Sequence, residues 1–179
     1  SSQNEFKPIW SPDGRWIAYT TWSHARGGHI YKIRSDGKGK PRQLTDIEAF
    51  STDLAFSPDG STIVAMRGNE FLRNQTFSEF GGLRIPLELI SLPAKGGEQT
   101  VIAALDSGRY PHFGPESGRV YLTGDEGLFS LTLSGTDYRD EMMVNAPRGN
   151  QRGDDPPRAE VIYIHPDGNA VLAFANKQV

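Results

Sequence analysis

The sequence has 179 residues, of which 36% are hydrophobic and 23% charged, with a formal net charge of −3. This balance is enough for one domain with a core and offers no electrostatic basis for binding nucleic acid or an anionic membrane. Cysteine is absent, which excludes a disulfide scaffold, a thiol nucleophile and cysteine metal ligands. The 20 glycines and 12 prolines favour a chain rich in turns, as an all-β protein requires.

The first predicted unit is built around Ser-Pro-Asp-Gly at residues 11–14, between two apolar runs. Proline presets φ for the second turn position, aspartate can bond its own backbone, and glycine tolerates positive φ. The pattern predicts the tip of a β-hairpin with strands over residues 7–10 and 16–22. Further strands are expected at 29–34 and 42–45, which completes a four-stranded blade over residues 1–46.

The second predicted unit covers residues 47–105 and repeats Ser-Pro-Asp-Gly at 57–60. Its strands are expected at 54–56, 62–67, 87–92 and 100–104, and an insertion over residues 68–86 separates the second from the third. A loop this long in a compact domain is usually functional or packed on a neighbour. Six of its residues are candidates for contact with a partner, with plain core packing of the aromatic members as the alternative: Phe71, Arg73, Phe77, Glu79, Phe80 and Arg84.

The third predicted unit covers residues 106–145, with strands expected at 110–113, 119–123, 127–133 and 140–144. Its tip is weaker, with Glu116 in the acidic place and one extra residue before Gly118. A half unit follows over residues 146–179, where strands at 160–164 and 170–174 flank a fourth tip. The tip residues of all four units are read as structural: Pro12, Asp13, Gly14, Pro58, Asp59, Gly60, Pro115, Gly118, Pro166, Asp167 and Gly168.

The hairpin unit recurs every ~50 residues, and the sequence between its copies contains patterns typical of strands only. This indicates β-propeller blades. The predicted fold class is therefore an all-β propeller of four-stranded antiparallel blades. About three and a half blades are present, and such an incomplete ring leaves strand edges open. The chain also opens without an initiator Met or a signal-peptide pattern. We therefore expect a part of a larger propeller, completed by other residues of the parent protein, by a partner, or by a second copy in a homodimer.

Motifs that carry catalysis are missing from the sequence. It contains no Gly-x-Ser-x-Gly, His-x-His or His-Glu-x-x-His pattern. Ser11 and Ser57 are most simply the first residues of their turns. No catalytic residue and no metal-binding residue is predicted within this chain.

Three weaker patterns have both a structural and a functional interpretation. His24 and His29 flank a glycine-rich turn and could meet a metal ion, although a loop histidine and a strand histidine are the simpler interpretation. The carboxylate pairs Asp125-Glu126 and Asp154-Asp155 fit solvated loops better than a general acid–base pair, which requires a cleft. The strand aromatics, which are Trp10, Trp16, Trp22, Phe56, Phe113 and Tyr121, are mostly expected to pack between blades.

Residues 10–19 and 56–64 resemble the TolB-like propeller repeat, a WD40-like repeat also called PD40. Pro-Arg-Gln-Leu-Thr at residues 41–45 resembles the fourth strand of that repeat. This resemblance covers most of the chain and implies a propeller.

A narrower resemblance links residues 76–89, 108–113, 119–122 and 127–131 to the propeller that precedes the catalytic barrel in large bacterial amidohydrolases. It implies an exported protein, periplasmic or extracellular, that hydrolyses C–N bonds with zinc or another divalent metal. The metal ligands of that group would lie in a barrel that this chain does not contain. Blade three departs from the repeat at Gly114 and Glu116.

Three functions remain open at this point. The first is a non-catalytic scaffold domain that packs on such a barrel and gates it. The second is a protein-binding propeller of the cell envelope, like TolB. The third is the gating propeller of a serine peptidase. All three have a protein partner, with neither nucleic acid nor membrane insertion.

Overall fold

The structure is a computed structural model that describes residues 4–23, 27–68, 87–106, 108–144 and 158–176. In these residues the regular secondary structure consists of fourteen β-strands and no helix, so none of them forms a helix that could cross a membrane. The chain divides into two compact units, Ser1–Ser107 and Gly108–Val179. The all-β fold class is confirmed.

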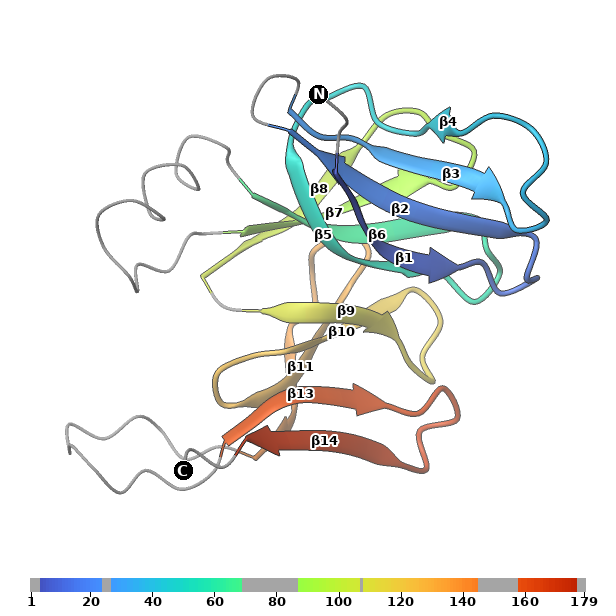
Figure 1. Cartoon of the computed structure of the whole chain (residues 1–179). Coiled ribbons are helices and arrows are strands. Elements are labelled where there is room, and N and C mark those ends of the chain that lie inside the picture. The colour runs from blue at the N-terminus through green and yellow to red at the C-terminus, as the bar shows by residue number, and fades with distance from the viewer. Residues whose placement is uncertain (1–3, 24–26, 69–86, 107, 145–157, 177–179) are drawn as a thin grey trace. The chain divides into compact units, whose positions relative to one another are not determined.

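The first unit contains two sheets of four strands (Figure 1). Each sheet has its strands in chain order and every neighbouring pair is antiparallel. The strands of the first sheet are β1 (Asn4–Trp10), β2 (Trp16–Trp22), β3 (Ile30–Arg34) and β4 (Arg42–Gln43), and those of the second are β5 (Phe50–Phe56), β6 (Thr62–Gly68), β7 (Leu87–Pro93) and β8 (Thr100–Leu105).

The second unit contains one four-stranded and one two-stranded sheet (Figure 1). The strands are again antiparallel and follow the chain order. They are β9 (Arg109–Phe113), β10 (Arg119–Thr123), β11 (Gly127–Thr132) and β12 (Arg139–Met143), followed by β13 (Arg158–Ile164) and β14 (Val171–Asn176).

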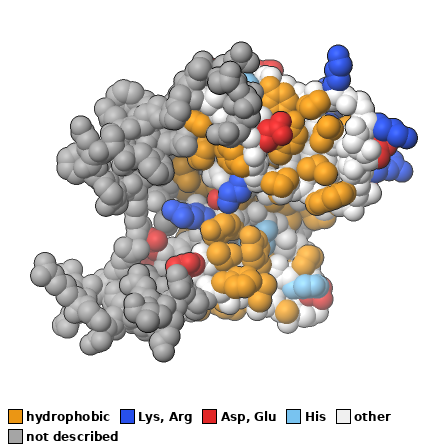
Figure 2. All heavy atoms as spheres, in the orientation of Figure 1, with side chains coloured by type: hydrophobic (Ala, Val, Ile, Leu, Met, Phe, Trp, Pro, Cys, Tyr) orange, Lys and Arg blue, Asp and Glu red, His pale blue; other side chains and the backbone are white. Residues whose placement is uncertain are grey.

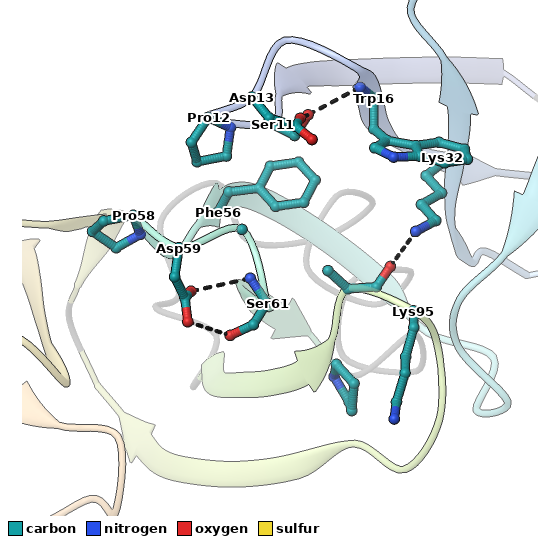
Figure 3. A pocket seen from close by; sticks show the side chains of 13 residues that line it. Ser11, Pro12, Asp13, Trp16, Lys32, Phe56, Pro58, Asp59, Ser61 and Lys95 are labelled. Atoms are coloured by element: carbon teal, nitrogen blue, oxygen red, sulfur yellow. Dashed lines mark hydrogen bonds between the residues drawn. The ribbon is translucent and has the colours of Figure 1, made fainter.

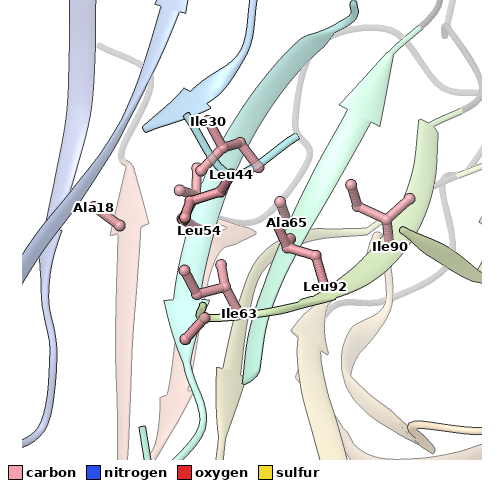
Figure 4. Close-up of a cluster of buried hydrophobic side chains, with 9 residues drawn as sticks. Ala18, Ile30, Leu44, Leu54, Ile63, Ala65, Ile90 and Leu92 are labelled. Atoms are coloured by element: carbon pink, nitrogen blue, oxygen red, sulfur yellow. The ribbon is translucent and has the colours of Figure 1, made fainter. Parts of the chain in front are cut away.

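The core of the first unit lies between its two sheets (Figure 4). Ala18 and Ile30 of the first sheet meet Leu54, Ile63 and Ile90 of the second, and all five are at most 6% exposed. Strand β6 is buried on both faces, because Ile63 to Met66 are all 0% exposed. Burial on both faces explains why the apolar run at 63–66 does not alternate with polar residues.

The tips of neighbouring blades pack proline against glycine within each unit. A Cβ atom on Gly60 would lie 3.6 Å from Cδ of Pro12, and one on Gly168 would lie 3.1 Å from Cγ of Pro115. Both glycines have positive φ, 70° and 76°. Both positions therefore favour glycine for the turn conformation, whereas only Gly168 also needs it for the close approach of the preceding blade, since 3.6 Å at Gly60 is an ordinary van der Waals contact.

The first strand of each blade begins earlier than the sequence predicts. In all four blades a register shift interrupts the ladder between the first and second strands, and in three of them a residue of the bulge has positive φ: Lys7, Asp53 and Tyr110, at 53°, 50° and 55°. Each of these residues lies five positions before its tip proline. A bulge breaks the alternation of inward and outward side chains, so the residues before it do not show a strand pattern. In the first unit, Lys7 Nζ forms an ion pair with Asp53 Oδ1 at 3.2 Å, which joins the two bulges.

The prediction that strand aromatics pack in the interior is confirmed for several residues and wrong for Trp10. Trp22 and Tyr121 are buried, at 4% and 1% exposure, and Phe56 packs partly buried against the core between the first two sheets. Trp10, in contrast, is 62% exposed. It is the last residue of β1, where the strand passes into its tip and extends beyond the core. Exposed apolar side chains occur in both units (Figure 2).

Two glycines of the second unit provide a matched test of tip packing. Gly118 and Gly168 have nearly the same φ, 75° and 76°, but only a Cβ on Gly168 would press on Pro115. We expect Gly118→Ala to lower the free energy of unfolding by about 1–2 kcal/mol, the cost of the left-handed conformation. Gly168→Ala should cost about 1 kcal/mol more because of overpacking. Urea unfolding followed by circular dichroism measures both, and equal losses would contradict proline–glycine packing.

Candidate functional site

In the two Ser-Pro-Asp-Gly tips the serine is buried, and its hydroxyl forms hydrogen bonds within the turn. Ser11, 6% exposed, donates a hydrogen bond to Asp13 Oδ1 at 2.6 Å and accepts one from the Trp16 amide at 2.9 Å. The Arg15 amide also donates to Asp13 Oδ1. The hydrogen bond from Ser11 is the largest cause of a lowered pKa for Asp13. The serine hydroxyl is thus committed to the turn as both donor and acceptor.

The second tip repeats this arrangement. Ser57 donates to Asp59 Oδ1 at 2.5 Å and accepts from the Thr62 amide at 3.0 Å. The amide and the hydroxyl of Ser61 also donate to the Asp59 carboxylate. These bonds, led by the one from Ser57, lower the pKa of Asp59 to about 2. The carboxylate stays ionised at neutral pH, so Asp59 cannot serve as a general acid there.

A groove of about 640 Å³ lies between these two tips (Figure 3). Pro12 and Pro58 belong to the tips themselves, and Trp16 and Phe56 supply aromatic surface. The turn after β7 closes the groove with Pro93, Ala94 and Lys95. We take this tip groove as the candidate functional site, because it combines apolar surface with charged groups inside one unit.

Lys32 connects the two blades across the tip groove. Its ammonium group lies 4.4 Å from the centroid of the Trp16 ring and donates a hydrogen bond to the Ala94 carbonyl at 2.6 Å. Burial, with a smaller contribution from Arg42, lowers the pKa of Lys32. The cation–π contact and the hydrogen bond offset this desolvation. Lys32, Lys95, Asp13 and Asp59 all line the groove, so it carries charges of both signs.

The described histidines are held by structural contacts. Nδ1 of His29 lies 3.1 Å from the Thr45 hydroxyl, and Nδ1 of His165 lies 2.7 Å from Asp167 Oδ1. The two ring nitrogens of His112 meet the Tyr110 carbonyl and the Ile164 amide. Within the described residues no group of three His, Asp or Glu side chains is placed to hold a metal ion.

Several predicted residues lie outside the described part of the chain. They are the six partner-contact candidates Phe71, Arg73, Phe77, Glu79, Phe80 and Arg84, together with His24, Asp154 and Asp155. The pair Asp125-Glu126 is described and lies in the turn between β10 and β11, where the Gly124 amide bonds the Gly127 carbonyl. The proposed roles of these residues remain predictions.

The tip of the third blade is stabilised by a residue that the sequence reading did not single out. Arg119, 2% exposed, donates to Ser130 Oγ and to the Asp137 carbonyl, each at 2.9 Å. It also forms ion pairs with the carboxylates of Asp137 and Glu116. This network takes the place of the serine–aspartate pair, because Gly114 stands where the first two tips have serine. The signal in the sequence was Glu116 three residues before Arg119.

The role of the serine hydroxyl can be tested at the second tip. Ser57→Ala leaves the Thr62 amide without its side-chain acceptor and Asp59 without its strongest donor. We expect a loss of about 1–2 kcal/mol in the free energy of unfolding. The pKa of Asp59 should rise from about 2 toward its ordinary value, as measured by NMR titration. Ser61→Ala is the control, and a larger rise in that variant would contradict the leading role of Ser57.

No family model matches the sequence. Among curated proteins, a stretch of 57 residues is 37% identical to the uncharacterized peptidase YuxL of Bacillus subtilis, which covers 32% of this chain and 8% of YuxL. The chain is therefore similar to a small part of that protein.

Several solved structures resemble nearly the whole chain. An oligogalacturonate lyase in complex with manganese has a TM-score of 0.66 at 17% identity and matches 97% of this chain. TolB from Acinetobacter baumannii has a TM-score of 0.62 at 16% identity and matches 96%. The chain spans 47% of the lyase chain and 37% of the TolB chain. At these identities the likeness shows the fold alone, and the chain has the β-propeller fold of TolB and oligogalacturonate lyase.

Proposed function

We propose that this chain is a non-catalytic part of a β-propeller that serves as an interaction and scaffold domain. The observation that carries the proposal is the state of the tip serines and aspartates. Ser11 and Ser57 hold both sides of their hydroxyl groups in turn hydrogen bonds, and Asp13 and Asp59 are bound by backbone amides. The residues with the most catalytic potential therefore serve the architecture.

The last sheet supports the idea that the propeller is larger than the described residues. Strand β14 pairs only with β13 there, and its Leu172 and Phe174 are 56% and 55% exposed. The corresponding second strands of the other blades are paired on both sides, and β10 is buried along its whole length. Further strands would cover these apolar side chains and complete the blade.

We further propose that the propeller packs on a hydrolase domain of an exported protein and limits access to its active site. Support comes from the resemblance of residues 76–89 and 108–113 to the propeller of bacterial amidohydrolases. On this proposal the hydrolase is a metal-dependent enzyme that cleaves C–N bonds, and its zinc or other divalent metal lies in that domain. The six insertion residues from Phe71 to Arg84 would form part of the contact.

Two alternatives have their own support. The stretch similar to YuxL favours a propeller that gates a peptidase, since YuxL carries a peptidase name. The likeness to TolB favours a propeller that binds an envelope protein. A homodimer that completes the ring is a further arrangement, and the mass of the chain in solution tests it.

The proposal predicts that the 179-residue chain has no hydrolase activity of its own. It should turn over neither N-acyl amino acids, nor peptide substrates, nor oligogalacturonate, with or without added Zn²⁺ or Mn²⁺. In the parent protein, deletion of residues 69–84 should weaken the association of the propeller with the hydrolase domain or widen the range of substrate sizes. Replacement of Gly37 to Gly39, a turn in the first blade, by another turn sequence is the matched control.

Two results would overturn the proposal. Turnover by the chain alone would show a catalytic site within it. A deletion variant with unchanged domain association and an unchanged substrate range would remove the gating role. Stoichiometric capture of a foreign envelope protein would instead favour the TolB-like alternative.

A further inference from the structure

The inner strand of the half blade is fastened to blade three by two side chains. Strand β13 pairs with β14 along one edge. Near its other edge, Thr123 Oγ1 of β10 accepts a hydrogen bond from the Ile162 amide at 2.8 Å and donates to the Ile162 carbonyl at 3.0 Å. Two residues further on, the Ile164 amide donates to His112 Nε2 of β9 at 3.0 Å. We call Thr123 and His112 together the blade clasp.

The contacts of His112 are compatible with one protonation state. Nδ1 lies 2.9 Å from the Tyr110 carbonyl, which can only accept, so Nδ1 carries a proton. Nε2 faces the Ile164 amide, which can only donate, so Nε2 carries none. The ring is therefore a neutral imidazole. A second proton, on Nε2, would place two hydrogen-bond donors opposite each other, the ring N–H and the Ile164 amide.

The surroundings of His112 favour the neutral ring. The side chain is 9% exposed, and its closest ring neighbours are Tyr163 of β13, at 4.8 Å between centroids, and Tyr121 of β10, at 6.0 Å. Burial lowers the pKa of His112, and the bond to the Tyr110 carbonyl opposes this shift only in part. Burial also raises the pKa of Tyr121, which stays uncharged near neutral pH.

The charged side chains that the structure describes on the elements around the clasp are exposed or already paired. Arg109 of β9 and Glu160 of β13 are exposed. Arg119 of β10 is paired with Glu116 and Asp137, and His165 after β13 is paired with Asp167. Strands β11 and β14 contain no ionisable side chain. The described contacts of His112 are the Tyr110 carbonyl, the Ile164 amide and two tyrosine rings, and none of them is a carboxylate.

We propose that the blade clasp is proton-sensitive, so that the β13–β14 hairpin loosens from blade three as the pH falls below about 6.5, the ordinary value for histidine. Protonation converts Nε2 from acceptor to donor and removes the bond from the Ile164 amide. Thr123 still holds Ile162, so the hairpin loosens first near its tip, at Ile164. The proposal concerns the chain itself and is independent of the partner that the propeller serves.

Because the pKa of His112 is lowered in the folded chain, the free energy of unfolding decreases as the pH falls. The unfolded chain takes up the proton near pH 6.5, whereas the folded chain resists it until a lower pH. The stability that the neutral ring contributes is complete above pH 6.5 and is lost as the pH falls through that value. Between pH 7.5 and 5.5 the unfolding equilibrium constant should rise by up to about tenfold from this one residue.

The test uses the 179-residue chain and three variants. Urea unfolding at pH 7.5 and 5.5 gives the ratio of equilibrium constants, and hydrogen exchange at Ile164 reports local opening. His112→Gln, which does not titrate, should abolish the part of the pH dependence that belongs to this residue. Thr123→Val should weaken the same junction while keeping the pH dependence, and His165→Ser should leave the opening of Ile164 pH-dependent.

NMR titration of the His112 ring in the unaltered chain provides a second readout that needs no variant. A pKa below the ordinary value, together with a lower protection factor of the Ile164 amide in acid, after correction for the intrinsic exchange rate at each pH, supports the clasp. A pKa at or above the ordinary value overturns the proposal. Unchanged pH dependence in His112→Gln overturns it as well, because the effect would then come from another group.

Discussion

The whole architecture depends on the closure of short hairpin tips by buried polar bonds. A hydroxyl at 6% exposure would be costly without partners, and in Ser11 and Ser57 it has both a carboxylate acceptor and an amide donor. These bonds fix where the first strand ends and the second begins. Because a shift of one residue would turn every side chain to the opposite face, the tip also sets which residues enter the core.

The four tips close their hairpins with different chemistry, and the third also has a different turn hydrogen bond, from the Arg119 amide to the Glu116 carbonyl. Two use serine with aspartate, and the fourth pairs His165 with Asp167, whose carboxylate also accepts from the Asn169 amide. The third relies on the buried Arg119 and its acidic partners. In each unit the tip proline of one blade then packs on the glycine of the next, so local turn geometry becomes packing between blades. The repeat is therefore a repeat of shape more than of sequence.

The use of polar side chains in structural hydrogen bonds also limits what the chain can do chemically. The candidate nucleophiles and bases form structural hydrogen bonds that hold strands together. Examples are Ser57, Asp59 and His112. Among the described residues of the first unit, the tip groove offers an accessible surface. It is lined by aromatic side chains, prolines, and charged groups of both signs. Such a surface fits contact with another protein region better than bond cleavage. The scaffold proposal follows from this distribution of engaged and available groups.

The sequence by itself determined the strand order, the position of every tip and the all-β fold class. These follow from turn residues and apolar runs that lie within about ten residues of each other, so neighbouring positions carry the information. The second strands of blades one and three were predicted to the residue, at Trp16–Trp22 and Arg119–Thr123. The first strands were predicted too short, because bulges at Lys7 and Asp53 interrupt their alternation.

The tertiary structure alone decided which residues meet across blades. Lys32 reaches Ala94, Pro12 approaches Gly60, and His112 accepts from Ile164, and each pair is separated by at least 48 positions along the chain. No local pattern specifies such contacts, since they depend on how one sheet packs on the next. For the same reason the sequence marked Trp10 as a packing residue, although its position at the end of β1 leaves it exposed.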